Sequence, residues 1–139
     1  MHFTIHADGG ARGNPGPAGA GAIIRDQEGS AVGAVSKFLG TRTNNYAEYE
    51  AVILAFQELL TLVPESKRKE TGVTVKMDSE LVVKQMKGEY KVKHPDLREQ
   101  YVRLLPLVAS FKTVTFMHVP REQNSDADAL ANEAMDKGA

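Results

Sequence analysis

The sequence predicts an α/β protein in which helices pack on one mixed β-sheet. Three strand-like runs come first, and short turns rich in glycine and polar residues join them. Later strands alternate instead with helix-like segments, as in units that place parallel strands side by side. At 139 residues, with 42% hydrophobic and 25% charged residues, the chain is long enough to bury a substantial core. We therefore expect a single domain over residues 1–139.

The first part of the chain contains the predicted antiparallel strands. Alternating or continuous apolar runs predict strands at residues 2–7, 19–26 and 31–38. The polar, glycine-containing connection Asp26–Ser30 is typical of a hairpin between the second and the third strand.

Helices and strands alternate in the rest of the chain. Apolar spacing, capping residues and helix breakers define these elements. In order, they are a helix at 46–62, a charged loop at 65–72, a strand at 73–77, a helix at about 80–88, a helix at 94–108, a strand at 114–119 and a helix at 124–135. In sheets of this kind, ligand sites gather where strand ends meet helix starts.

Four acidic residues lie at these predicted boundaries. Asp8 and Asp78 each follow a strand, whereas Glu48 and Asp128 lie in the first turns of helices. Each acid alone has an ordinary explanation, such as capping a helix or a turn. If the two strands are neighbours, however, all four carboxylates could converge. Oxygen ligands without histidine or cysteine suit Mg²⁺ or Mn²⁺, and a bound cation would relieve their mutual repulsion.

Residues beside these acids suit a phosphodiester substrate. The glycine-rich stretch after Asp8 allows close approach of a ligand to the backbone. Neutral donors and acceptors for phosphate or ribose oxygens are offered by Asn14, Thr43, Asn44 and Asn45. Helix capping explains the asparagine pair equally well.

Charge and composition exclude several classes of protein. The net charge of −1 gives no overall attraction to nucleic acid, although four lysines lie between Lys84 and Lys93. That stretch is either a solvated helix face or a phosphate-contacting patch. The absence of cysteine excludes disulfides, zinc–thiolate sites and a cysteine nucleophile. No apolar run approaches the ~18 residues that span a bilayer, so we expect a cytoplasmic protein without a membrane partner.

Four blocks of sequence, which together cover nearly the whole chain, resemble ribonuclease H type 1. They are Asp8–Ala11 with Gly13–Gly16, Thr43–Asn45 with Ala47–Tyr49, Asp78–Ser79, and Arg121–Asn124 with Ala127–Asp128 and Leu130–Asn132. The resemblance implies the ribonuclease H-like fold, a five-stranded mixed sheet in the order 3-2-1-4-5 flanked by helices. It also implies endonucleolytic hydrolysis of the RNA strand of RNA–DNA hybrids, leaving 5′-phosphate and 3′-hydroxyl ends. Two Mg²⁺ ions about 4 Å apart, or Mn²⁺ as an alternative, would serve this reaction. No protein partner is implied, and we expect a monomer.

The resemblance also implies roles for individual residues. Asp8, Glu48, Asp78 and Asp128 match the catalytic metal ligands. The expected substrate contacts are Gly10, Ala11, Arg12, Asn14, Thr43, Asn44 and Asn45, with Lys84 and Lys87 as further candidates. Asp126 competes with Asp128 for the role of fourth ligand, but on a helix it would face away.

Two features depart from the better-known bacterial members and resemble a shorter, archaeal-like type. The loop at residues 119–123 lacks their histidine, and we expect Arg121 to take its place. Arginine cannot shuttle a proton at neutral pH, but it can hold a phosphate. We expect His118 to be buried or otherwise satisfied. The long basic protrusion of some members is also missing. As alternatives to an active ribonuclease H, the chain could be a catalytically weak hybrid-binding module or another nuclease of the same fold.

Overall fold

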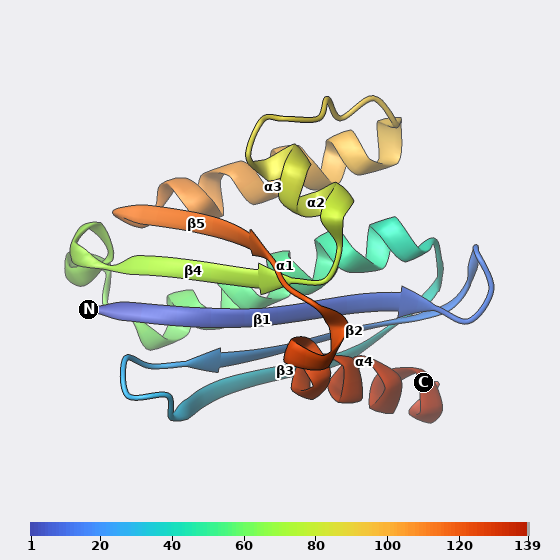
Figure 1. Cartoon of the computed structure of the whole chain (residues 1–139), viewed down its shortest axis with the longest axis horizontal. Helices are drawn as coiled ribbons and strands as arrows, with labels where there is room; N and C mark the ends of the chain where they lie inside the picture. Colours follow the sequence, from blue (N-terminus) through green and yellow to red (C-terminus); the bar gives the residue numbers. More distant parts are fainter. Residues whose placement is uncertain (139) are drawn as a thin grey trace.

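The protein contains one five-stranded sheet in the order β3-β2-β1-β4-β5 (Figure 1). The computed structural model describes residues 1–138. Its strands are β1 (His2–Ala11), β2 (Gly16–Arg25), β3 (Ala31–Arg42), β4 (Gly72–Met77) and β5 (Thr113–His118). The pairs β1–β2 and β2–β3 are antiparallel, whereas β4 pairs in parallel with both β1 and β5. The predicted mixed sheet and its strand order are therefore confirmed.

Helices cover both faces of this sheet (Figure 1). They are α1 (Asn44–Leu62), α2 (Glu80–Met86), α3 (Pro95–Ala109) and α4 (Ser125–Lys137), with 3₁₀ turns η1 (Glu65–Glu70) and η2 (Arg121–Asn124). Helix α1 packs on one face, and α4 packs on the other face against β2, β3 and β1. Across residues 1–138, we find no helix with the length and apolar character needed to cross a membrane.

The main core lies between the sheet and α1. Alternate side chains of the central strands, such as Ile5 in β1 and Val75 in β4, are fully buried there, in the same hydrophobic cluster as Phe56 of α1. Because successive side chains of a strand point to opposite faces, the residues between them face the α4 side. This alternation places Asp8 on the α4 side of the sheet, and Asp78 lies directly after the end of β4.

Helix α4 lies directly on two glycines of β2. A Cβ atom added to Gly21 would lie 2.3 Å from the carbonyl oxygen of Ala127, and one added to Gly19 would lie 2.5 Å from that of Ala131. Only glycine allows a helix backbone to approach a strand this closely. The position of α4 relative to the sheet is therefore fixed by backbone contact rather than by adaptable side chains.

Two differences between the structure and the prediction matter for the site: the end of β1 and an additional turn. Strand β1 continues to Ala11 instead of ending at residue 7, because Gly9 and Gly10 pair with Ala20 and Gly19 of β2. Asp8 thus lies within a paired strand rather than after its end. The turn η2, which leads from β5 into α4, was not predicted.

Candidate active site

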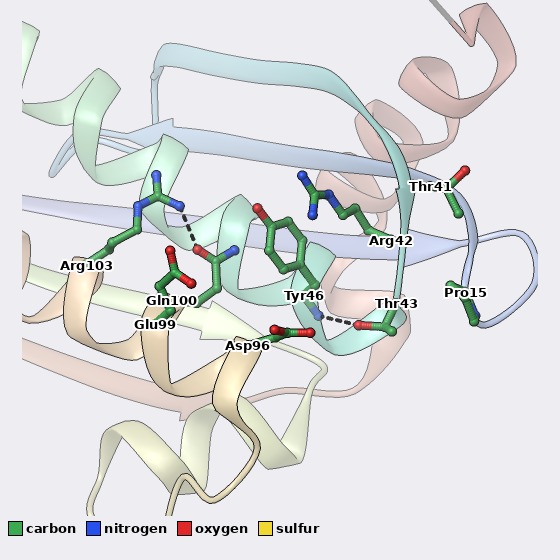
Figure 2. A pocket seen from close by; sticks show the side chains of 9 residues that line it. All are labelled: Pro15, Thr41, Arg42, Thr43, Tyr46, Asp96, Glu99, Gln100 and Arg103. Carbon is green, nitrogen blue, oxygen red and sulfur yellow. Dashed lines mark hydrogen bonds between the residues drawn. The ribbon is translucent and has the colours of Figure 1, made fainter.

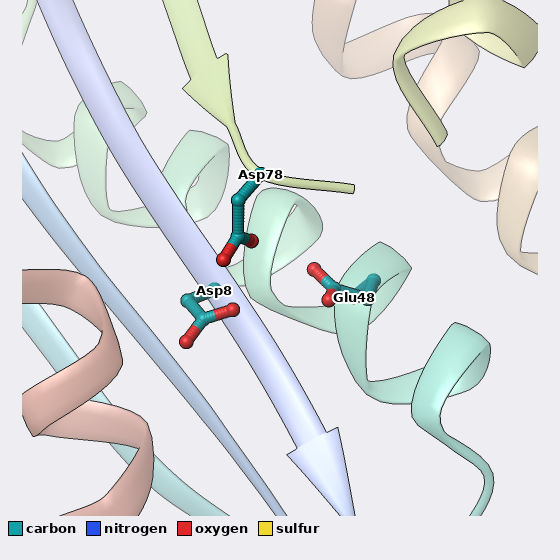
Figure 3. Close-up of side chains that lie close together, drawn as sticks. All are labelled: Asp8, Glu48 and Asp78. Carbon is teal, nitrogen blue, oxygen red and sulfur yellow. The ribbon is translucent and has the colours of Figure 1, made fainter. Parts of the chain in front are cut away.

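Three carboxylates meet beside the central strands β1 and β4. Asp8 of β1, Asp78 directly after β4 and Glu48 of α1 each offer one oxygen, and these oxygens lie within 4.8 Å of one another. Figure 3 shows the three side chains turned toward a common centre. The expectation that Asp8 and Asp78 lie on neighbouring strands is confirmed by the parallel pairing of β1 and β4.

The start of α1 carries Glu48 to this centre. Thr43 caps the helix, since its hydroxyl accepts a hydrogen bond of 3.2 Å from the backbone N–H of Tyr46. Gly9 then lets α1 rest on β1, because a Cβ atom there would lie 2.1 Å from the carbonyl oxygen of Ala47. Glu48, the next residue, is held directly beside Asp8 as a result.

The carboxylates are poorly compensated by the protein itself. The pKa of Asp8 is raised to about 8, first by burial, then by a hydrogen bond shared with Asp128 and by the charges of Asp78 and Asp128. Burial and the charges of Asp8 and Asp78 raise the pKa of Glu48 well above its usual value, against the opposing effect of the Gly9 N–H. The Oε2 atom of Glu48 is buried without a hydrogen-bond partner. This all-oxygen set with one unsatisfied atom fits a hard divalent cation.

Asp128 lies on the α4 wall of the same hollow but outside the close group of three. Its Oδ2 atom accepts a hydrogen bond of 3.3 Å from the side-chain amide of Asn132, and its Oδ1 lies 3.6 Å from a guanidinium nitrogen of Arg121. Asp126 instead forms a 2.8 Å ion pair with Arg25 of β2. The structure therefore brings Asp128, and not Asp126, to the acidic cluster.

The hollow around these acids has a volume of about 320 Å³. Its lining residues are Asp8, Gly9, Gly10, Ala11, Arg12, Asn44, Glu48, Asp78, Arg121, Asp128, Ala131, Asn132 and Met135. Among the expected substrate contacts, Gly10, Ala11, Arg12 and Asn44 thus share one surface with the acids.

Hydrogen bonds hold the rim of this hollow. The Asn44 side chain accepts a 2.7 Å bond from the backbone N–H of Ala11, and the Asn14 side chain accepts a 3.0 Å bond from that of Asn44. Arg12 forms a 2.6 Å ion pair with Asp136 at the end of α4. The turn between β1 and β2 is thereby tied to α1 on one side and to α4 on the other.

Thr43, Asn45 and Asn14 line a smaller hollow of about 120 Å³ together with the start of α3.

Thr43 also borders a third hollow of about 460 Å³ between α1 and α3 (Figure 2). There the Arg42 guanidinium lies 4.5 Å from the centre of the Tyr46 ring. Arg103 bonds Gln100 at 2.6 Å and pairs with Glu50 at 3.0 Å. Cations and acids alternate in this hollow, so it has no single charge.

Lys84 and Lys87 do not line the hollow around the acids. The Lys84 ammonium forms a 2.9 Å ion pair with Glu80 and lies 5.0 Å from the ring centre of Tyr90. Lys87 is exposed at the end of α2. A further hollow of about 490 Å³ lies beside them, and the cations that line it are Lys91, Lys93 and Arg98. No carboxylate is among its lining residues.

Two residues near the site, His118 and Asn124, have surroundings that the sequence did not predict. His118 is exposed at the end of the edge strand β5, so the expectation of a buried histidine is wrong. Asn124 is buried, donates a 2.8 Å hydrogen bond to the carbonyl of Ala7 and lies 3.3 Å from a ring nitrogen of His6. It anchors η2 beside Asp8, a role that sequence spacing alone does not reveal.

Comparison with known proteins identifies the family. Residues 6–134 match the family model described as reverse transcriptase-like. The structure superposes on that of ribonuclease H1 from the archaeon Halobacterium salinarum with a TM-score of 0.90 and 37% identity, covering 99% of both chains. The chain belongs to the ribonuclease H family. Its resemblance to the type 1 enzymes is thereby confirmed.

Two further ribonuclease H relatives extend the comparison. The bifunctional protein Rv2228c of Mycobacterium tuberculosis is 46% identical over 140 residues, which cover all of this chain but only 37% of that protein. The chain thus spans well under half the length of the curated relatives that it matches first. LC11-RNase H1, crystallised in complex with an RNA/DNA hybrid, aligns with a TM-score of 0.88 and 44% identity over 97% of both chains.

Proposed function

We propose that this chain hydrolyses the RNA strand of RNA–DNA hybrids, using two divalent ions held by Asp8, Glu48, Asp78 and Asp128. The observation that carries this proposal is the partly buried carboxylate cluster, in which no lysine or arginine neutralises Asp8, Glu48 or Asp78 within the described residues. Mg²⁺ is the expected metal and Mn²⁺ the alternative. The hybrid-bound structure of the LC11 relative supports the choice of substrate.

The acids would act as ligands that must lose their protons when metal binds. The raised pKa values of Asp8 and Glu48 favour protonated carboxyls in the metal-free protein, so metal binding releases protons. When bound, the ions would supply a hydroxide-like nucleophile and stabilise the leaving oxygen of an in-line displacement. Arg121, which approaches the Asp128 oxygen that Asn132 does not bond, would hold the scissile phosphate.

The rim of the hollow would meet the minor groove of the hybrid. The backbone at Gly10, Ala11 and Arg12 allows close approach, and Asn14, Asn44 and Asn45 would offer hydrogen bonds to both strands. Thr43 would contact a phosphate of the DNA strand, while Glu48 would also accept a bond from a ribose 2′-hydroxyl. That last contact would make RNA, and not DNA, the strand that is cut.

Positive charge near α2 would add affinity without sequence preference. Lys84 and Lys87 stay proposed phosphate contacts, with Lys84 partly engaged by Glu80. A single domain over residues 1–139, action as a monomer and a cytoplasmic location also remain predictions.

The direct test is cleavage of labelled duplexes by the purified protein in Mg²⁺ or Mn²⁺. We expect cleavage of the RNA strand of a hybrid, with 5′-phosphate and 3′-hydroxyl ends, and none of double-stranded RNA or DNA. Asp8→Asn protein and an EDTA-treated sample are the matched controls. Hybrid binding without cleavage at any metal concentration would identify a binding module instead, and cleavage of DNA would identify another nuclease of this fold.

A further inference from the structure

We propose that Asn132 is a positioning residue that sets the orientation of the Asp128 carboxylate. This inference rests on the proposed function, since it concerns a residue proposed there as a metal ligand. The side-chain amide of Asn132 donates to Oδ2 of Asp128 at 3.3 Å and to the backbone carbonyl of the same residue at 3.1 Å. Asn132 also lines the catalytic hollow.

The rigid seating of α4 makes side-chain rotation the main freedom of Asp128. The helix backbone touches β2 at Gly19 and Gly21, where not even a methyl group would fit. The backbone of Asp128 therefore cannot move toward Asp8 without breaking this contact. Residues four apart lie on the same face of a helix, so Asn132 is placed to control that rotation.

The two oxygens of Asp128 are held unequally. Oδ2 is bonded by the partly buried amide of Asn132, whereas Oδ1 lies 3.6 Å from Arg121, whose side chain is 77% exposed. Asn132 therefore fixes one oxygen of the Asp128 carboxylate and leaves the other without a close hydrogen-bond partner from Arg121. Carboxylates that bind a metal are commonly held in place by hydrogen bonds from neighbouring groups.

The adjacent residue of α4 supplies a matched control. Glu133 is exposed and forms a 2.8 Å ion pair with Lys137 on the outer side of the helix. Glu133→Gln changes the same helix at the neighbouring position without touching the hollow. Asn132→Ala removes the amide donor while introducing the residue with the highest helix propensity, so the helix should persist. Asn132→Gln keeps an amide within reach of Asp128.

The first measurement is Mn²⁺ binding to the substrate-free protein, by calorimetry or electron paramagnetic resonance. We expect Asn132→Ala to weaken binding about 10-fold, as is typical when a group that orients a metal ligand is lost. Asn132→Gln should recover most of the affinity, and Glu133→Gln should match the wild type. On a hybrid substrate, the turnover number of Asn132→Ala should fall about 10-fold with KM unchanged within about twofold.

Several outcomes would overturn the inference. Wild-type Mn²⁺ affinity in folded Asn132→Ala would show that the amide does not orient a ligand. A rise in KM with unchanged turnover would make Asn132 a substrate contact instead. Failure of Asn132→Gln to restore Mn²⁺ affinity lost in Asn132→Ala would also count against it. If the wild type bound Mn²⁺ but did not cut hybrids, the proposed function would fail while the Mn²⁺ titrations still decided the role of Asn132.

Discussion

Two glutamates on α1, only two residues apart, are treated in opposite ways by the rest of the molecule. Glu50 is buried against α3, where it pairs with Arg103 at 3.0 Å and lies 3.5 Å from the amide of Gln100. Glu48 faces Asp8 and Asp78 and keeps one buried oxygen with no hydrogen-bond partner. One acid is neutralised by the protein, and the other adds to a cluster of like charge.

This difference indicates that Glu50 stabilises the fold, whereas Glu48 is suited to bind a metal ion. A buried charge is tolerated when a cation and hydrogen bonds compensate it, as at Glu50. Where a cation and hydrogen-bond donors are missing, the buried carboxyl either takes up a proton or binds a metal ion. Burial alone therefore does not distinguish the two roles, but the partners of each carboxylate do.

The largest expected effect is the loss of cleavage in Asp8→Asn. A metal ion contributes several kcal/mol to the reaction, so we expect turnover to fall by about 100- to 1,000-fold or more. Single-turnover cleavage of a hybrid measures this loss, and Asp128→Asn should show a similar one. Asp126→Ala is the control, since it loses only the exposed pair with Arg25 and should stay near wild-type activity. Full activity in Asp8→Asn would remove this cluster from the mechanism.

The contrast between the two glutamates should appear as opposite changes in stability. In EDTA, Glu48→Gln should raise the free energy of unfolding, because it removes a carboxyl that in the metal-free folded protein must either take up a proton or carry an uncompensated charge. Arg103→Met should lower it by about 1 kcal/mol, a value reduced by the partial exposure of the arginine, because Glu50 loses its cation. Urea denaturation measures both variants. Changes of the same sign would mean that the two acids do not differ as the contacts indicate.

A pH dependence should follow from the raised pKa of Asp8. Its folded pKa of about 8 exceeds the unfolded value of 3.8, so its stabilising contribution is complete below pH 3.8 and is lost as the pH rises toward 8. In EDTA, the Tm of the wild type should therefore fall over this window more steeply than that of Asp8→Asn. Added Mg²⁺ should reverse the decline by binding the charged carboxylates. If the Tm values of the two proteins changed with pH in parallel, Asp8 would not have a raised pKa in the folded protein.

The smallest effect is expected at Arg121. Its side chain is 77% exposed, and such a cation contributes up to about 1 kcal/mol, which is about a fivefold change in rate. Arg121→Ala should lower turnover by about this factor while Mn²⁺ affinity in the absence of substrate stays unchanged. Arg121→Lys tests whether charge alone suffices. Equal losses of turnover and Mn²⁺ affinity would indicate that Arg121 supports Asp128 rather than the phosphate.

Local sequence patterns predict most of the strands and helices and indicate which acids could form the cluster. Spacing places Asp8 and Asp78 each directly after a predicted strand, and the parallel pairing of these strands, which was predicted only as a condition, brings the two acids together. The end of β1 was predicted too early, because glycine usually ends a strand but here pairs with β2. The contacts of Asn124 with Ala7 and of Arg103 with Glu50 join residues 117 and 53 positions apart. No local pattern reports such pairings, since they exist only after the sheet has formed.

The glycines of β2 carry a practical consequence for attempts to raise the thermal stability of this protein. Replacing glycine by alanine is a standard route to a stiffer unfolded chain and a higher melting temperature. At Gly21, the added methyl group would meet the backbone of Ala127 at 2.3 Å and push the last helix outward. Gly21→Ala would therefore lower the melting temperature instead of raising it, and it would displace Asp128 on α4 although Gly21 has no side-chain chemistry of its own.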